Sequence, residues 1–341
     1  MNTRIALVLG ATGGIGGEVA SRLAAGGWRV RALNRNPDRT GKDAPFQWIR
    51  GDAMVAADVM KAAEGAALIV HAVNPPGYRD WDKLVLPMLD NTIAAAEANG
   101  ARILLPGTVY NYGPDAFPVV TDDAPQNALT RKGRIRVEME RRLKAAASRG
   151  KATVLIVRAG DFFGPRAANN WFSQGLVKAG NRPKAITYPG KRGVGHQWAY
   201  LPDMAEAMAR LVEHAGLDDF ASFNFGGHWD GDGTAMTEAI RHALDDPFLP
   251  VKGMPWWLMR LAAPFVPFLR EVMEMRYLWT VLVRLDNAKL MAILGGEPHT
   301  PLDEAVRATL IGVGCLGSEE TPSGISRARA FLASPGSPER L

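Results

Sequence analysis

Ile5-Ala6-Leu7-Val8-Leu9-Gly10-Ala11-Thr12-Gly13-Gly14-Ile15-Gly16 is the segment that decides the fold of this 341-residue chain. An apolar run typical of a buried strand leads into a glycine-spaced turn, and a helical pattern follows over residues 17–23. Gly10 permits a tight turn, Gly13 lets main-chain N–H groups approach a phosphate, and Gly16 lets the helix pack closely on the strand. The segment therefore predicts a dinucleotide site formed by Gly10, Thr12, Gly13, Gly14, Ile15 and Gly16.

The glycine spacing is Gly-x-x-Gly-x-x-Gly, with Ala11-Thr12 between the first two glycines. This pattern resembles the extended short-chain dehydrogenase/reductase superfamily, of the NAD(P)-dependent epimerase/dehydratase type. The resemblance covers nearly the whole chain and implies an α/β fold, a Rossmann-type doubly wound parallel sheet with a smaller, mostly helical C-terminal substrate lobe. Apolar strand-like runs that alternate with helical patterns agree with such a sheet.

The alternation changes near Gly164-Pro165, where a loop-rich stretch begins that runs to Gly195. A helix with Pro202 at its first position and a strand at residues 222–225 then follow. We therefore expect an NADP-binding domain of residues 1–165 and 199–226, a substrate lobe of residues 166–198 and 227–333, and a flexible tail at residues 334–341. The expected lobe helices cover residues 234–244, 255–279 and 286–294, and one more opens with the box Thr300-Pro301-Leu302-Asp303.

The second strand ends in Asn34-Arg35, where an NAD enzyme of this fold presents an acid to the ribose 2′-hydroxyl. Because an arginine beside a neutral amide suits a 2′-phosphate, the sequence favours NADP(H) over NAD(H). The alternative is that Arg35 is a solvated loop charge. The resemblance implies further cofactor contacts at the ends of later strands, namely Asp52, Ala53, His71, Ala72, Val73, Ala159, Asp161 and Phe162. Asp52 could equally cap a helix that begins near Met54.

The superfamily uses a Ser/Thr, a Tyr and a Lys for catalysis. Its Ser/Thr-x-x-x-Tyr-Gly pattern reads Thr108-Val109-Tyr110-Asn111-Tyr112-Gly113 here, which puts Thr108 at the hydroxyl position. The alternative is a turn threonine that binds its own backbone. The family's Tyr-x-x-x-Lys pair is missing, because no tyrosine lies between Tyr112 and Tyr188.

A family spacing gives the register of the active-site helix. In extended members a glutamate precedes the arginine of the sixth strand, and counting back eighteen positions from Arg158 reaches Glu140. That register places Lys132 at the tyrosine position and Arg136 at the lysine position. A register shifted by two residues would place Thr130 and Arg134 there instead.

Two residues can replace the missing tyrosine as proton donor. Lys132 would release its proton more readily if it were desolvated against the nicotinamide or placed beside Arg136. Tyr110 takes the place of one member of the acid pair in the related sugar-nucleotide dehydratases. The alternatives are a solvated helix lysine and a packed aromatic ring. Asp161, the sole acid of the segment after Arg158, is either a site residue or a turn aspartate.

The expected reaction is hydride transfer from NADPH to a carbonyl-like carbon, in which Thr108 steadies the oxygen and Lys132 or Tyr110 supplies the proton. Two alternatives remain. A sugar-nucleotide epimerase or dehydratase would retain its cofactor and need no net reductant. A non-catalytic NADP(H) sensor would account directly for the absent tyrosine.

Composition limits the class of protein. With 47% hydrophobic and 22% charged residues the chain can bury a large core. A single cysteine, Cys315, and the lack of a readable secretory leader predict a cytoplasmic protein. The net charge is +5, but the basic residues are dispersed except at 131–136 and no nucleic-acid motif accompanies them. We therefore expect a small-molecule substrate, no nucleic-acid partner and no bound metal, and leave a homodimer open.

Bulky apolar residues dominate the segments 254–259 and 261–269. Such a stripe is typical of a core, and it predicts an apolar or aromatic substrate if part of it faces the cleft. A peripheral membrane contact is a third interpretation, whereas Pro264 and Pro267 argue against a transmembrane span. A sugar nucleotide would need cations for its diphosphate, and Lys191, Arg192 and Arg210 are available.

Overall fold

The computed structural model describes residues 4–40, 44–75, 80–167 and 170–317. A seven-stranded sheet lies at its centre in the order β11-β7-β5-β4-β1-β2-β3, and every neighbouring pair is parallel. The strands are β1 (Ile5–Leu9), β2 (Arg29–Asn34), β3 (Gln47–Arg50), β4 (Ala66–His71), β5 (Arg102–Thr108), β7 (Thr153–Ala159) and β11 (Phe220–Asn224). The predicted doubly wound parallel sheet is confirmed, and the carboxyl ends of its strands meet at one edge.

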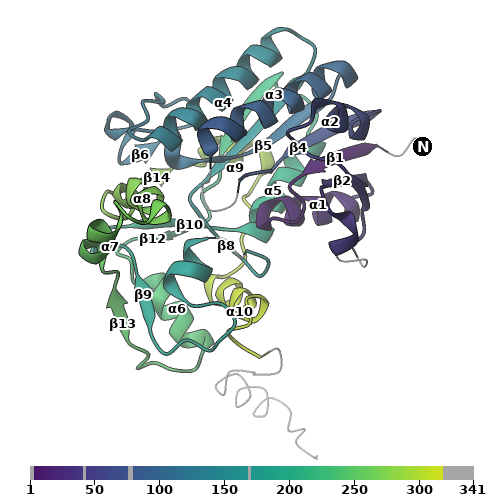
Figure 1. Cartoon of the computed structure of the whole chain (residues 1–341). Helices are drawn as coiled ribbons and strands as arrows, with labels where there is room; N and C mark the ends of the chain where they lie inside the picture. Colours follow the sequence, from purple (N-terminus) through teal and green to yellow (C-terminus); the bar gives the residue numbers. More distant parts are fainter. Residues whose placement is uncertain (1–3, 41–43, 76–79, 168–169, 318–341) are drawn as a thin grey trace, which may run out of the picture.

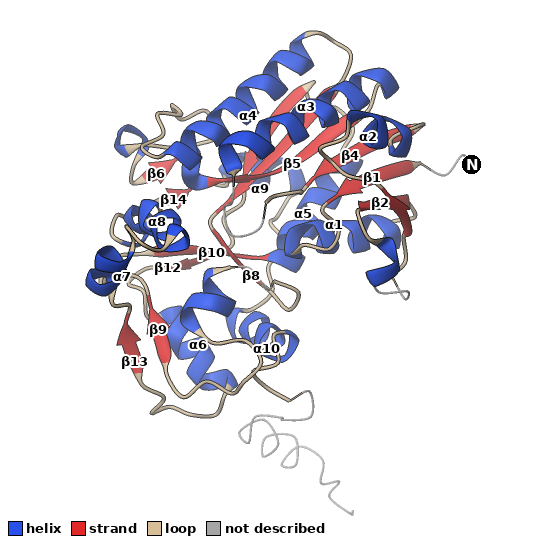
Figure 2. Ribbon diagram, viewed as in Figure 1, coloured by secondary structure: helices blue, strands red, loops and turns tan. Residues whose placement is uncertain are grey.

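Helices cover both faces of this sheet (Figures 1 and 2). On one face α1 (Gly14–Ala25) packs against α5 (Leu201–Glu213), and α9 (Ala288–Leu294) lies against β11. The other face carries α2 (Ala56–Ala62), α3 (Trp81–Asn99) and α4 (Arg131–Ser148). Two clusters of buried aliphatic side chains, one on each face, form the core of this domain.

The second lobe is smaller and contains strands as well as the expected helices. Three short strands form one sheet, namely β8 (Asp161–Phe163), β10 (His196–Tyr200) and β12 (His228–Asp230). Two further pairs are β9 (Ile186–Tyr188) with β13 (Val251–Gly253), and β6 (Val119–Val120) with β14 (Arg284–Leu285). Helices α6 (Ala235–Ala243) and α10 (Leu302–Gly312) pack beside the aromatic core of the lobe. The chain thus leaves the main sheet at Gly160 and returns to it for α5 and β11.

Two local predictions are wrong. The single helical stretch expected at residues 255–279 is divided into α7 (Trp256–Ala262), α8 (Pro267–Glu274) and the 3₁₀ turn Arg276–Trp279. The reason is that Pro264 and Pro267 interrupt its hydrogen-bond pattern. The expected capping box also does not form, because Thr300 donates its N–H and its hydroxyl to Asp203, both at 2.7 Å. The predicted tail at residues 334–341 lies outside the described residues.

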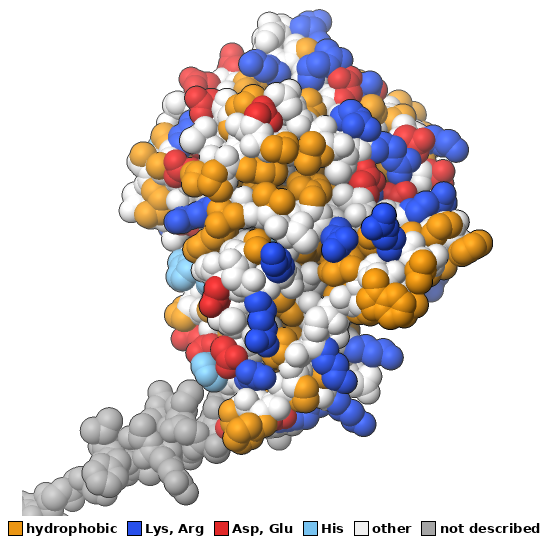
Figure 3. Space-filling model, turned by 90° about the vertical axis from the view of Figure 1, so that its left-hand side faces the viewer, with side chains coloured by type: hydrophobic (Ala, Val, Ile, Leu, Met, Phe, Trp, Pro, Cys, Tyr) orange, Lys and Arg blue, Asp and Glu red, His pale blue; other side chains and the backbone are white. Residues whose placement is uncertain are grey.

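Helices α7 and α8 occupy one side of the lobe (Figure 1). Figure 3 views this side and shows apolar side chains on the surface, with Lys and Arg side chains beside them. No helix within the described part of the chain has the length and apolar character needed to span a bilayer.

Candidate functional site

The glycine turn after β1 has the geometry that its sequence predicts. Gly10 has a φ of +93°, and a Cβ on it would lie 2.5 Å from the carbonyl oxygen of Ala72. A Cβ on Gly16 would lie 2.3 Å from the carbonyl oxygen of Gly10, so only glycine lets α1 approach β1 this closely. Gly13 caps α1 and donates its N–H to the Gly10 carbonyl at 2.9 Å. The exposed residues Thr12 and Gly13 thus lie at the N-terminus of α1, which suits a phosphate.

Two arginines lie where β2 and β3 end. Arg35 is exposed, and the side chain of Asn34 accepts a hydrogen bond from the N–H of Asn36 at 2.7 Å. Arg50, which pairs with Asn34 in the sheet, donates to the Arg35 carbonyl at 3.2 Å and forms an ion pair with Asp38. Arg50 was missed by the sequence reasoning, although it ends β3 just before Asp52. The edge therefore presents Arg35 as an exposed cation, with Arg50 beside it held by Asp38.

Asp52 and Ala53 form the turn after β3. Asp52 accepts a hydrogen bond from the N–H of Met54 at 3.0 Å, whereas α2 begins only at Ala56. The alternative that Asp52 caps a helix beginning near Met54 is therefore wrong. Ala53 is buried, and its carbonyl accepts from Asn91 at 2.9 Å.

His71 ends β4 and is buried against α3. Its Nδ1 lies 2.8 Å from the hydroxyl of Thr92, which donates its own proton to the Met88 carbonyl. Nδ1 is therefore the donor in this pair, and Nε2 has no hydrogen-bond partner among the described residues. Burial, with the nearby positive charge of Arg136, lowers the pKa of His71 to about 3. The ring is neutral. The half-buried Ala72 and Val73, which follow His71 in the chain, lie against Gly10 of the glycine turn.

Thr108 and Tyr110 lie where β5 meets α4. The Thr108 hydroxyl oxygen accepts a hydrogen bond from the N–H of Tyr110 at 3.3 Å, as the turn-threonine alternative predicts. That bond uses an oxygen lone pair and leaves the hydroxyl proton for another acceptor. A Cβ on Gly133 would lie 2.2 Å from the Tyr110 carbonyl oxygen, so the first turn of α4 lies directly against this segment.

A buried ion pair joins α4 to β7. Arg158 donates through Nε and Nη2 to the carboxylate of Glu140, at 3.0 and 2.7 Å. Glu140 and Arg158 are the two residues between which the family spacing was counted. The assignment of Lys132 to the tyrosine position and of Arg136 to the lysine position stays a prediction. The Arg136 guanidinium lies over the ring of Trp81, 5.1 Å from its centroid, near the end of β4.

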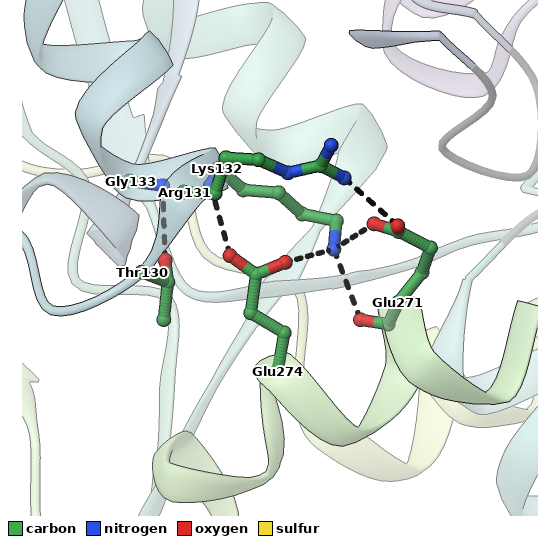
Figure 4. A network of polar contacts seen from close by, with 6 residues as sticks. All are labelled: Thr130, Arg131, Lys132, Gly133, Glu271 and Glu274. Atoms are coloured by element: carbon green, nitrogen blue, oxygen red, sulfur yellow. Dashed lines mark hydrogen bonds and ion pairs between the residues drawn. The ribbon is translucent and has the colours of Figure 1, made fainter. Parts of the chain in front are cut away.

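Lys132 is fully buried and holds two carboxylates of the lobe (Figure 4). Its Nζ lies 2.7 Å from Glu274, forms an ion pair with Glu271 and donates to the Glu271 carbonyl at 3.0 Å. The Lys132 N–H also donates to Glu274 at 3.0 Å, and Arg131 pairs with Glu271 at 2.8 Å. The alternative that Lys132 is a solvated helix residue is therefore wrong. Its ammonium is buried and is balanced by two carboxylates.

A cavity of about 420 Å³ lies between the loop after β4 and the helices α7 and α8. Its lining is mainly apolar and includes the amide side chains of Asn74, Asn170 and Gln174. The other lining residues are Pro75, Trp171, Gly175, Met254, Pro255, Met259, Phe268, Val272 and Met275. Helix α8 supplies Phe268 and Val272 to this wall and Glu271 and Glu274 to Lys132. The ion pairs thus fix the helix that forms one side of the cavity.

A family model described as "NAD dependent epimerase/dehydratase family" matches residues 6–226. The chain belongs to this family. A curated relative, the uncharacterized protein y4nL of Sinorhizobium fredii (strain NBRC 101917 / NGR234), is 24% identical and covers 91% of this chain and 95% of its own length.

Solved structures of epimerases share the fold. A putative epimerase from Burkholderia cenocepacia J2315 is 19% identical, with a TM-score of 0.71 over 92% of this chain and 99% of its own. The UDP-glucuronic acid 4-epimerase from Bacillus cereus, solved in complex with NAD, is 15% identical, with a TM-score of 0.71 over 93% of this chain and 98% of its own. At these identities the likeness establishes the fold.

The family segment after β7 turns toward the lobe. Ala159 is buried at the end of β7 and Phe162 is half-buried in β8. The carboxylate of Asp161 lies 2.9 Å from Nε2 of His196, whose ring stacks on Trp279 with the centroids 3.8 Å apart. Asp161 is thus part of a polar pair in the lobe sheet rather than a simple turn aspartate.

Sequence reasoning missed His196, Glu271 and Glu274, because no local motif marks them. Each reaches the site only through pairing of β8 with β10 or packing of α8 on α4. Within the described ranges, no three His, Cys, Asp or Glu side chains come together as a metal site.

Proposed function

We propose that this protein is a reductase that binds NADP(H) and reduces a carbonyl-like carbon of a small, apolar or aromatic substrate. The observation that carries the proposal is the place of the apolar cavity. Asn74 and Pro75 line it, and they follow directly on the residues that pack against the glycine turn. A nicotinamide bound at this edge supplies the hydride, and the protein has to bind the substrate, exclude water and deliver a proton.

The residues at the sheet edge suit the cofactor. The N-terminus of α1, with the exposed Thr12 and Gly13, offers main-chain N–H groups to a pyrophosphate. Arg35, supported by Arg50, offers cationic groups to a 2′-phosphate, and no acid takes the place that NAD enzymes use for the 2′-hydroxyl. This favours NADP(H), although the B. cereus epimerase was solved with NAD.

The lining of the cavity favours an apolar substrate. Six of its lining side chains are Trp, Met, Phe or Val, and Pro75 and Pro255 add two apolar rings. No Lys or Arg is among the lining residues. A diphosphate would have to be desolvated there without a cation. Asn74, Asn170 and Gln174 can instead orient one carbonyl or hydroxyl group.

Proton delivery is assigned to the segment after β5. The Thr108 hydroxyl can donate to the reacting oxygen, and the phenol of Tyr110, two residues on, is the proposed proton donor. Lys132 is assigned a positioning role, since two carboxylates balance its charge and its ammonium holds α8 against α4. Arg136 remains charged and can bind a cofactor hydroxyl, but it cannot supply a proton near neutral pH.

Two measurements test the proposal. Titration of the purified protein with NADPH and NADH should give tighter binding of NADPH, and a screen of apolar aldehydes and ketones should reveal NADPH oxidation. NADPH binding without turnover of any compound in a broad panel would favour the sensor instead. Equal binding of both cofactors would remove the basis for NADP(H).

The sugar-nucleotide epimerase is the second candidate, favoured by the structural likeness to the B. cereus enzyme over 93% of this chain. Such an enzyme would be purified with its cofactor bound and would interconvert UDP-sugars without net NADPH oxidation. Conversion of a UDP-sugar under those conditions would replace the reductase proposal.

A further inference from the structure

The pair of helices α7 and α8 exposes a large apolar surface. No residue of α7 is buried, Trp257 is 69% exposed and Phe265, between the helices, is 85% exposed. We call the exposed apolar side chains of this pair the hairpin patch: Trp257, Leu258, Leu261, Phe265, Val266 and Phe268. Figure 3 views the side of the molecule on which this pair lies. A contiguous surface of this kind on a soluble protein usually marks an interaction site.

The charged residues of the segment that carries the hairpin patch have one sign. Residues 247–270 contain Lys252, Arg260 and Arg270 and no Asp or Glu. All three cationic residues are exposed. The first acids that follow, Glu271 and Glu274, point to Arg131 and Lys132 on α4 (Figure 4). The patch therefore presents aromatic and aliphatic groups with only positive charge between them.

We propose that the hairpin patch docks this protein on an anionic phospholipid bilayer. Trp and Phe side chains are favoured at the boundary between headgroups and acyl chains, and Lys and Arg are attracted to anionic headgroups. The helices lie on the membrane rather than cross it, since α7 and α8 have 7 and 8 residues and Pro264 lies between them.

Charge also decides between a membrane and a second copy of the chain. A symmetric dimer through the hairpin patch would bring two patches that both carry Arg260 and Arg270 face to face, and like charges oppose such pairing. An anionic surface compensates the same charges. Phe268 belongs both to the patch and to the cavity wall, so docking would place the cavity next to the bilayer.

Co-sedimentation with vesicles tests the proposal. The protein should pellet with vesicles of phosphatidylcholine and phosphatidylglycerol, should bind weakly to phosphatidylcholine alone, and should be released by salt. The triple variant Trp257→Ser/Leu261→Ser/Phe265→Ser should weaken vesicle binding by about tenfold or more, because each side chain loses its apolar burial. Arg260→Glu/Arg270→Glu should remove the preference for the anionic lipid.

The matched control is Val55→Ser/Met60→Ser, which removes two exposed apolar side chains at α2, on the other domain. It should bind vesicles as the unchanged protein does. Unfolding temperature and NADPH affinity, measured for every variant, show that the fold is intact. Failure of the unchanged protein to bind anionic vesicles would overturn the proposal, as would equal vesicle binding by the triple variant. A dimer in solution that the triple variant abolishes, without vesicle binding, would assign the patch to a second copy instead.

Discussion

The carboxylate of Glu274 lies 2.7 Å from the ammonium of Lys132, and this contact joins α8 of the lobe to α4 of the sheet domain. Lys132 is completely buried, whereas the side chains of Glu271 and Glu274 are each 20% exposed. The Lys132–Glu274 ion pair therefore stabilises the packing of α8 on α4, which the sequence did not reveal.

Lys132→Met should destabilise the protein by about 3 kcal/mol, because two partly buried carboxylates lose their counter-charge. Chemical denaturation measures the loss, and Lys151→Met, at an exposed lysine beyond α4, should have little effect.

Burial acts to raise the pKa of Glu274, but hydrogen bonds from Lys132 outweigh it and the pKa is lowered. The stabilisation by Glu274 is thus complete above the ordinary value of 4.5 and is lost as the pH falls below it, so the two proteins should converge in stability on acidification. A constant difference at every pH would contradict this account.

Arg35→Ala should remove much of the preference for NADPH, about 1 to 3 kcal/mol, since a charge-assisted contact to the 2′-phosphate is lost. NADH affinity should change little. Isothermal titration with both cofactors gives the two values. Arg29→Ala, at the other end of β2, serves as the control. An unchanged ratio of the two affinities would show that the phosphate lies elsewhere.

Gly13→Val should abolish cofactor binding in a folded protein. The backbone at Gly13, with φ −86° and ψ 164°, accepts any residue, but the branched side chain would occupy the space in front of α1. Circular dichroism and cofactor titration separate the two effects. Gly296→Val, at a glycine with nothing near its Cβ position, should bind normally. Normal binding by the Gly13 variant would refute the assigned phosphate site.

Once a substrate is found, Tyr110→Phe should lower kcat about 100-fold or more, because the ring packing survives and only the phenolic proton is lost. Thr108→Val should also lower kcat by removing a hydrogen bond to the reacting oxygen. Steady-state kinetics with NADPH affinity as control tests both. Full activity of both variants would leave the segment after β5 without a role in proton delivery.

His71 should make stability depend on pH. Its pKa of about 3 in the folded protein lies below the ordinary 6.5, so the unfolded chain takes up a proton first as the pH falls. The contribution of neutral His71 to the free energy of unfolding is complete above pH 6.5. It is lost as the pH falls toward 3, by up to about 1.4 kcal/mol per pH unit. His71→Asn should flatten this dependence, whereas His214→Asn, at an exposed histidine, should not. Denaturation curves across this range provide the check.

Local pattern was enough to predict the main sheet and the glycine turn at its edge. Glycine spacing determines the turn at Gly10 to Gly16, and the alternation of strands and helices determines a parallel sheet whose strand ends meet. Glu140 and Arg158, between which the register of the active-site helix was counted, form a buried ion pair that the spacing itself did not predict.

The rest depends on contacts between distant segments. Glu271 and Glu274 lie 139 and 142 positions from Lys132, so no sequence window contains both partners. Pairing of β8 with β10, which brings His196 to Asp161, is equally remote from any motif. The division of the segment 255–279 was readable from its prolines, but the exposure of α7 was not, because an apolar stripe looks the same in a core and on a surface.

The order in which the chain supplies the main sheet limits how it can be cut. β11, the outermost strand beside β7, and α5, which covers α1, come only after the segment that forms part of the lobe. Any N-terminal fragment that stops near residue 165 would leave β7 as a bare edge and uncover the apolar side of α1. Such fragments should aggregate, so synthesis must pass Asn224 before the nucleotide-binding half can close its own core.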